Sequence, residues 1–332
     1  MNKLFARIID GMAIDLLAPR FSKSDVAIER NLHLIDNPPL PPRRLVKTPK
    51  LFLKNTGSKG LFDIYEYAFP SKVETASLQN NTVYGRYYRI KDGVPKSTVV
   101  FLHGMFESNH RRSERHALNF IKSGHNCLTM TLPHHIERAP RGWRSGRHFI
   151  SNDLTVIFTG LQQAMNDVMS LINWLKSNGE KRIGLIGIDV GGLIASLVAS
   201  STRRINYLLL LTPAISPLQV IGYTRSGRAV EGRIGATGLT KQELYMLFEP
   251  WTLLHNKPIV SNNRTLIIKA EHDTIIPADS IDRVWDAWEK PKMVASSHGH
   301  LSMMASRQVF REISAFLDYT FAPKKTTGAS AE

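Results

Sequence analysis

The feature that most constrains the fold is a regular alternation of short, uninterrupted apolar runs with helical patterns between residues 83 and 319. Strands are predicted at 83–90, 97–103, 125–131, 182–188, 205–212, 264–270 and 292–296. Helices are predicted at 113–122, 154–175, 279–288 and 301–319, and another opens at Gly191. Strands that are apolar along their whole length belong to a sheet buried on both faces, and strand–helix alternation makes neighbouring strands parallel. The sequence therefore predicts an α/β fold with a mostly parallel sheet covered by helices.

Three regions fall outside this alternation. Residues 1–75 are expected to be an irregular N-terminal extension that contains a helix and an extended, proline-rich segment around 38–42. Residues 76–322 are expected to form the folded domain. Within them, 213–263 are punctuated by glycines and interrupt the alternation, which predicts a small cap over the strand ends. Residues 323–332 are predicted to be a disordered tail.

The predicted N-terminal helix carries apolar residues at helical spacing. These residues are Leu4, Phe5, Ile8, Ile9, Met12, Leu16 and Leu17. Arg7, Asp10 and Asp15 interrupt the segment, so it lacks the unbroken apolar core of a secretory signal. Two interpretations remain open: the helix docks on the body of the protein, or it makes a peripheral contact with a membrane surface.

The composition narrows the class of partner. Lys and Arg number 43 against 28 Asp and Glu, a formal net charge of +15, yet the basic residues are spread along the chain without a nucleic-acid-binding motif. We therefore expect a small-molecule substrate and no nucleic acid; the oligomeric state is left open. The single cysteine, Cys127, excludes an internal disulfide and a cysteine metal site, and we expect a cytoplasmic protein.

Residues that could carry chemistry stand where predicted strands end, which is where parallel sheets bind ligands. His103-Gly104 ends one strand, Asp273 follows another, and His300 follows the last. Asp189 lies at a strand-to-helix junction, with Gly187 two residues before it and Gly191 two residues after it. Small residues at these positions allow a sharp turn that exposes the side chain between them. The backbone amides of Val190 and Met105 are then expected to face an oxyanion formed at this turn.

These motifs resemble those of the α/β-hydrolase superfamily over roughly residues 83–319. They are the H-G pair at 103–104, the G-x-nucleophile-x-G-G turn at 187–192, the D-x-I-I-P segment at 273–277 and the G-H pair at 299–300. The resemblance implies an α/β-hydrolase fold and a cofactor-free, metal-free hydrolase. It further implies that Asp189 is the nucleophile, Asp273 the orienting acid and His300 the general base, with Met105 and Val190 forming the oxyanion hole.

The chain departs from most members of the superfamily because aspartate stands where they carry serine. In this respect it resembles the epoxide hydrolases and haloalkane dehalogenases, in which an ionised aspartate attacks a saturated carbon. The flanking residues, Ile188 and Val190, are instead typical of the serine-dependent esterase branch that includes abhydrolase-domain proteins. Attack by aspartate on an ordinary ester would give a mixed anhydride, which is a poor route.

Three hypotheses therefore stay open. In the first, Asp189 is a working nucleophile in a hydrolase of small or medium apolar substrates. In the second, the chain is an esterase-type scaffold whose serine position holds Asp189, with reduced or altered activity. In the third, it is a non-catalytic relative that serves as a binding or interaction module.

Several residues have a competing interpretation. Asp189 could cap the following helix. Glu271 and His298 are alternatives to Asp273 and His300 as the acid and the base. Weaker candidates for substrate binding are His103, Trp143, Tyr223 and Tyr245. The adjacent pair His134-His135 lacks a third ligand at a suitable spacing, and no metal site is predicted.

Overall fold

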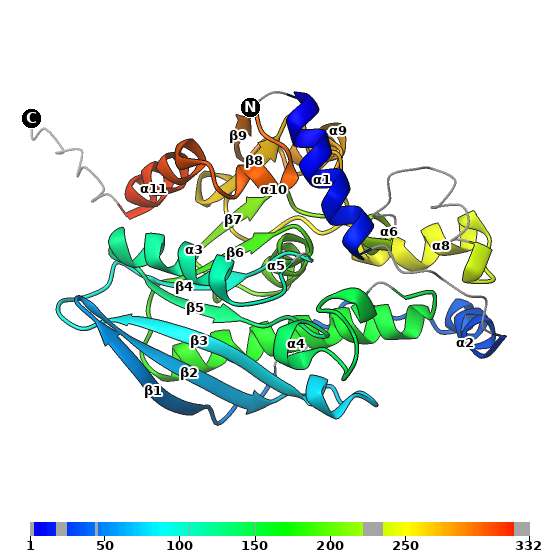
Figure 1. The fold of residues 1–332 in the computed structure, drawn as a ribbon, viewed down its shortest axis with the longest axis horizontal. Coiled ribbons are helices and arrows are strands. Elements are labelled where there is room, and N and C mark those ends of the chain that lie inside the picture. The colour runs from blue at the N-terminus through cyan, green and yellow to red at the C-terminus, as the bar shows by residue number, and fades with distance from the viewer. Residues whose placement is uncertain are drawn as a thin grey trace, which may run out of the picture.

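The computed structural model describes residues 3–17, 25–43, 46–105, 107–149, 151–221 and 235–321. In these residues nine strands form one sheet in the order β1-β2-β3-β5-β4-β6-β7-β8-β9 (Figure 1). The strands are β1 (Phe52–Lys59), β2 (Phe62–Pro70), β3 (Thr82–Ile90), β4 (Thr98–Leu102), β5 (Asn126–Met130), β6 (Ile183–Ile188), β7 (Tyr207–Leu211), β8 (Thr265–Ala270) and β9 (Lys292–Ser296). Following this order, the neighbouring strands in β1-β2-β3-β5 are antiparallel, and those in β5-β4-β6-β7-β8-β9 are parallel. The predicted mostly parallel sheet is confirmed.

The centre of the sheet consists of the strands that the sequence marks most clearly. Every residue of β4, β6 and β7 is buried, as an uninterrupted apolar run requires. These strands end side by side at the edge where the candidate residues stand. The sheet therefore provides a rigid platform for the loops that follow β4, β6 and β8.

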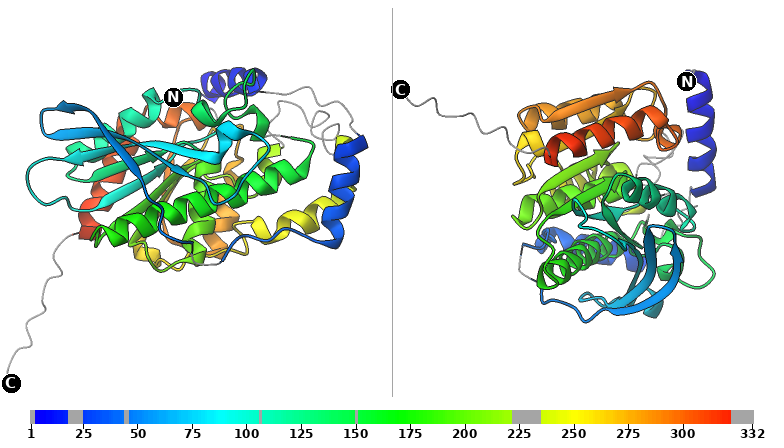
Figure 2. Two further views of the ribbon diagram at one scale, coloured as in Figure 1. Left: turned by 90° about the horizontal axis from the view of Figure 1, so that it is seen from below. Right: turned by 90° about the vertical axis from the view of Figure 1, so that its left-hand side faces the viewer.

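Helices cover both faces of the sheet (Figure 2). The helices are α1 (Lys3–Leu17), α2 (Asp25–Asp36), α3 (Arg111–Lys122), α4 (Leu154–Ser177), α5 (Val190–Ser201), α6 (Pro217–Ile221), α8 (Lys241–Phe248), α9 (Ala278–Ala287), α10 (His300–Met303) and α11 (Arg307–Phe321). Apolar side chains of α4, α5 and α9 share one hydrophobic cluster with the sheet. Side chains of α3 and α11 share a second cluster with it. The sheet is thus buried between two helical layers, as predicted.

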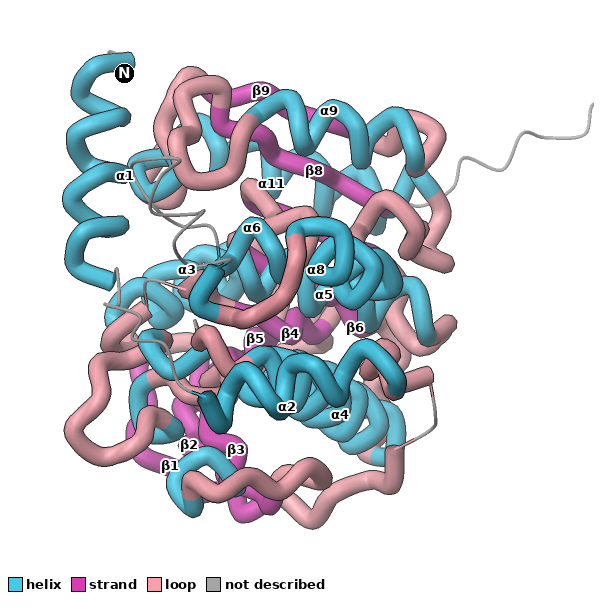
Figure 3. Tube along the Cα trace, turned by 90° about the vertical axis from the view of Figure 1, so that its right-hand side faces the viewer, coloured by secondary structure: helices cyan, strands magenta, loops and turns pink. Residues whose placement is uncertain are grey.

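The expectation of an irregular segment up to residue 75 is wrong for part of that region. Residues 52–59 and 62–70 form β1 and β2, and β2 pairs with the whole of β3. β1 is exposed along most of its length, so it carries polar residues and lacks the apolar run that marks a central strand. The preceding helix α2 packs against α4 and α8 (Figure 3).

Part of the predicted cap falls within the described residues. Within it, α6 and α8 pack against each other. Residues 222–234 of the predicted cap, Tyr223 among them, lie outside the described residues, as does the predicted tail at 323–332.

The N-terminal helix is confirmed as α1. Ala6 and Asp10 are fully buried against the body of the protein. Four large apolar side chains of α1 point away from it and are 47–65% exposed: Leu4, Phe5, Ile8 and Met12. Within the described residues no helix is long and apolar enough to cross the bilayer. The alternative interpretation, a peripheral contact of this helix with a membrane surface, stays a prediction.

Candidate active site

The turn between β6 and α5 has the strained geometry expected of a nucleophile elbow. Asp189 has φ 54° and ψ −121°, a backbone conformation that residues other than glycine rarely adopt. A Cβ at Gly187 would lie 2.2 Å from the carbonyl oxygen of Gly191, and a Cβ at Gly191 would lie 2.4 Å from that of His103. Only glycine fits either position, so the two glycines allow the chain to reverse here. The side chain of Asp189 does not cap α5, which excludes the alternative helix-cap role.

The carboxylate of Asp189 lies against the loop that follows β4. Its Oδ2 atom accepts a hydrogen bond of 3.0 Å from the backbone N–H of Met105, and the side chain is fully buried. Val190, the second predicted oxyanion residue, is the first residue of α5. A carboxylate oxygen therefore occupies the place where a developing oxyanion would accept the Met105 N–H.

His300 and Asp273 form a hydrogen-bonded pair opposite Asp189. His300 Nδ1 lies 2.7 Å from Asp273 Oδ2, and His300 Nε2 lies 3.8 Å from Asp189 Oδ2. The other oxygen of Asp273 accepts hydrogen bonds from the backbone N–H groups of Ile275 (2.8 Å) and Ile276 (2.7 Å). The three residues assigned by resemblance are thus brought together from the ends of β6, β8 and β9.

The two alternative residues are placed elsewhere. His298 turns its Nδ1 atom toward Ser296 Oγ at 2.8 Å, and the Glu271 side chain is exposed to solvent. The hydrogen-bonding pattern therefore favours Asp273 and His300 as the acid and base of the candidate site.

The two carboxylates beside His300 determine its protonation. Burial alone would lower the pKa of His300, but the negative charges of Asp273 and of Asp189, whose Oδ2 lies 3.8 Å from His300 Nε2, outweigh it and raise the pKa well above its ordinary value of 6.5. The two carboxylates therefore favour the protonated, imidazolium form of His300. A protonated histidine cannot accept a proton, so the charge of Asp189 opposes general-base chemistry by His300.

This electrostatic arrangement predicts that the stability of the protein depends on pH through His300, and that Asp189→Asn reduces this dependence. His300 should titrate above 6.5 in the unaltered protein, and its pKa should fall in the variant because one negative charge is gone. Because the folded-state pKa is raised, the stability that the imidazolium contributes is present below about pH 6.5 and lost as the pH rises through the folded pKa. Histidine NMR titration and urea unfolding at several pH values measure both effects. Identical His300 titration curves in the two proteins would contradict the prediction.

His103, a weak candidate for substrate binding, supports the oxyanion loop in this structure. Its Nε2 accepts the backbone N–H of Leu132 (3.0 Å), so Nδ1 carries the proton and donates it to the carbonyl oxygen of Gly104 (2.8 Å). Burial lowers the pKa of His103 to about 4, which keeps the ring neutral. The ring thereby holds the Gly104–Met105 peptide with its N–H directed at Asp189.

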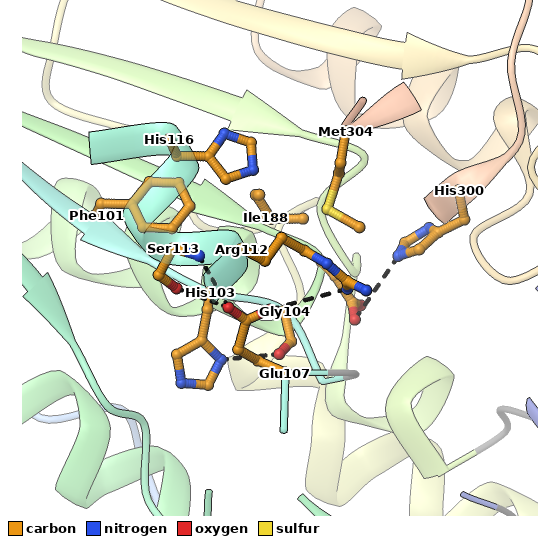
Figure 4. A pocket seen from close by; sticks show the side chains of 11 residues that line it. Phe101, His103, Gly104, Glu107, Arg112, Ser113, His116, Ile188, His300 and Met304 are labelled. Atoms are coloured by element: carbon orange, nitrogen blue, oxygen red, sulfur yellow. Dashed lines mark hydrogen bonds and ion pairs between the residues drawn. The ribbon is translucent and has the colours of Figure 1, made fainter. Parts of the chain in front are cut away.

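A small cavity lies beside the Asp189–His300 pair (Figure 4). Its volume is about 10 Å³, room for about one water molecule. Phe101, Ile188 and Met304 provide its apolar lining. Glu107 and Arg112 line it as well, and Arg112 Nη1 lies 3.8 Å from Glu107 Oε2. Glu107 is buried and Arg112 is partly exposed. Neither residue was predicted from the sequence; Glu107 lies in the same loop as the predicted Met105.

The other weak candidates lie away from this cavity. Trp143 is 51% exposed and packs edge-on against His148. Tyr245 is 54% exposed on α8 and lines a separate, open hollow with Met246 and Arg283. The structure therefore does not bring Trp143 or Tyr245 to the Asp189–His300 pair. Among the described residues, no group of three or more His, Cys, Asp or Glu side chains is arranged to hold a metal ion.

Comparison with protein families and known sequences finds similarity to α/β-hydrolases over part of the chain. The family described as "Alpha/beta hydrolase domain containing 18" matches residues 68–226, which include Met105 and Asp189. Uncharacterized protein Rv2627c of Mycobacterium tuberculosis is 29% identical over 197 residues, covering 59% of this chain and 46% of that protein. The chain thus spans about half the length of this relative.

Solved structures support the same fold. Acetyl xylan esterase 1 from Thermoanaerobacterium sp. JW/SL YS485 superposes with a TM-score of 0.60 at 13% identity, covering 94% of this chain and 98% of that one. Acetyl xylan esterase from Paenibacillus sp. R4 gives a TM-score of 0.57 at 15% identity, covering 91% and 98%. The chain therefore has the α/β-hydrolase fold. The resemblance to the aspartate-nucleophile branch stays a prediction.

Proposed function

We propose that this chain is an esterase-type α/β-hydrolase scaffold in which Asp189 occupies the position of the nucleophilic serine. The observation that carries the proposal is the Asp273–His300 hydrogen bond of 2.7 Å, with His300 Nε2 directed at residue 189 from 3.8 Å. The match to the abhydrolase-domain family and the Ile188 and Val190 flanks support the same lineage.

Asp189 limits what this scaffold does to an ester. Its Oδ2 atom accepts the Met105 N–H that would stabilise a tetrahedral oxyanion, and its charge raises the pKa of His300. Attack on an ester by the carboxylate would moreover form a mixed anhydride in place of an acyl-serine. We therefore expect little or no ester hydrolysis from the unaltered chain. Asp189→Ser, assayed with a chromogenic ester, tests the proposal.

A second candidate function has a specific observation in its favour. A nucleophilic aspartate places one carboxylate oxygen in the oxyanion hole and attacks with the other, and Asp189 Oδ2 has the first of these positions. Attack on a saturated carbon would displace a halide or open an epoxide and leave an alkyl ester on Asp189. Water, deprotonated by His300, would then attack the ester carbonyl carbon, releasing the alcohol and restoring the carboxylate.

Isotope labelling separates this second function from the first. In a single turnover of an epoxide or a haloalkane in oxygen-18 water, the hydrolytic oxygen remains on the enzyme. Mass spectrometry of the peptide containing Asp189 should then show one incorporated oxygen-18, and Asp189→Asn should show none. Turnover without a label on this peptide would exclude Asp189 as the nucleophile. Absence of turnover on esters, epoxides and haloalkanes, in the unaltered chain and in Asp189→Ser alike, would leave the non-catalytic binding module.

A further inference from the structure

Helix α1 places a buried carboxylate against the two loops that carry the candidate base and acid. Asp10 is fully buried. Its Oδ2 accepts hydrogen bonds from the backbone N–H of His300 (3.0 Å), the backbone N–H of Thr274 (3.3 Å) and the Thr274 hydroxyl (3.4 Å). Its Oδ1 accepts the backbone N–H of Leu301 at 3.2 Å. One side chain therefore joins the loop after β8 to the loop after β9.

These hydrogen bonds satisfy groups that the local sequence leaves unpaired. His300 and Leu301 are the first two residues of α10, and the preceding residue, Gly299, has no side chain with which to cap them. Backbone N–H groups at a helix start need an acceptor, which a neighbouring Asp, Asn, Ser or Thr usually supplies. Here Asp10 supplies it from 290 residues away. The orientation of His300 therefore depends on α1.

The packing around Gly299 shows that α1 is fitted to this place. A Cβ at Gly299 would lie 2.9 Å from Ala6 Cβ and 2.9 Å from Asp10 Oδ2. Gly299 has φ −88° and ψ 178°, which any residue adopts, so the glycine is required by the approach of α1 and not by the backbone. Figure 1 shows α1 beside α10. The small Ala6 and the buried Asp10 form the contact, while Leu4, Phe5, Ile8 and Met12 are exposed.

We propose that Asp10 is a positioning residue for the Asp273–His300 pair, and that the candidate site is complete only when α1 is docked. The inference rests on the proposed function for its catalytic meaning. Asp10 touches the backbone of His300 and of Thr274, the neighbour of Asp273, and no reacting atom. It holds the two loops at the separation that the 2.7 Å hydrogen bond between His300 and Asp273 requires.

The first test reads His300 directly and needs no activity. In the full-length chain with Asp189 present, Asp10→Ala should weaken or remove the low-field NMR signal of the His300 Nδ1 proton. It should also move the His300 pKa toward its ordinary value, because the contact with Asp273 loosens. Gly299→Ala, which displaces α1 from the opposite side, should have the same effect. Arg7→Ala, on the exposed side of α1, is the matched control and should change neither quantity.

The second test measures catalysis in the Asp189→Ser chain. Adding Asp10→Ala should lower kcat by about 10²-fold, the loss expected when a catalytic group is displaced by about 1 Å, with little change in KM. Asp10→Asn keeps one oxygen that can accept hydrogen bonds, so its kcat should be higher than that of Asp10→Ala. Circular dichroism establishes that each variant is folded.

The outcomes of the two tests separate the two proposals. A changed His300 signal in Asp10→Ala, together with an Asp189→Ser chain that is inactive, would support the positioning role and overturn the esterase proposal. An unchanged His300 signal, pKa and kcat in folded Asp10→Ala would overturn the positioning role. If Asp10→Ala does not fold, the same readings on Asp10→Asn and Gly299→Ala decide the question.

Discussion

Asp189→Ser is expected to hydrolyse a chromogenic acetate ester about 10³-fold faster than the unaltered chain, because the triad residues of serine hydrolases act as a unit. The substitution changes three things together. A hydroxyl nucleophile takes the elbow position, the Met105 N–H loses its contact with Asp189 Oδ2, and His300 loses one of its two neighbouring carboxylates. The last change lowers the pKa of His300. Because a base with a lower pKa is deprotonated at a lower pH, the rate of the serine variant should reach its plateau at a lower pH than it would with both carboxylates beside His300.

Two control variants separate this gain from a general loosening of the site. Asp189→Asn removes the charge and keeps the shape but provides no nucleophile, so it should remain at the background rate. Asp189→Ser combined with His300→Ala should lose the gain, a loss on the order of 10³-fold or more. Equal ester hydrolysis by the serine and asparagine variants would contradict the esterase lineage.

Gly191→Ala is expected to lower the free energy of unfolding by about 3 kcal/mol, at the upper end of the usual cost of overpacking. The new Cβ would lie 2.4 Å from the carbonyl oxygen of His103 and 2.6 Å from that of Leu102. Both are backbone atoms at the end of β4, so relief requires movement of the loop that carries the Met105 N–H. Alanine is favoured over glycine within a helix by up to about 1 kcal/mol, so a net loss must come from this steric contact.

Gly57→Ala is the matched control for this prediction. Gly57 lies in the exposed strand β1, and a Cβ there would meet no atom within 4 Å. Its substitution should change the unfolding free energy by no more than about 0.5 kcal/mol. Urea denaturation of both variants measures the difference. Similar losses at the two glycines would show that the elbow tolerates a Cβ and that the β4 loop is not rigidly placed.

The features predictable from the sequence are those set by short-range chemistry. Strands β4, β6 and β7 were identifiable because burial on both faces excludes polar residues from a central strand. The elbow at Asp189 was identifiable because only glycine fits at 187 and 191, two residues to either side. The edge strand β1 gave no such signal because solvent tolerates any side chain there.

Other features were decided only when distant parts of the chain came together. Neither the inward face of α1 nor the capping of α10 by Asp10 follows from periodicity, since the two hydrogen-bonded residues are 290 positions apart. The protonation of His300 likewise depends on two carboxylates from the ends of other strands. By itself, then, the sequence determined the α/β sheet and the shape of the elbow, because those depend on burial and sterics within a few residues. The tertiary structure alone decided how charges and hydrogen bonds meet around that elbow, because their strength depends on distances that local sequence does not specify.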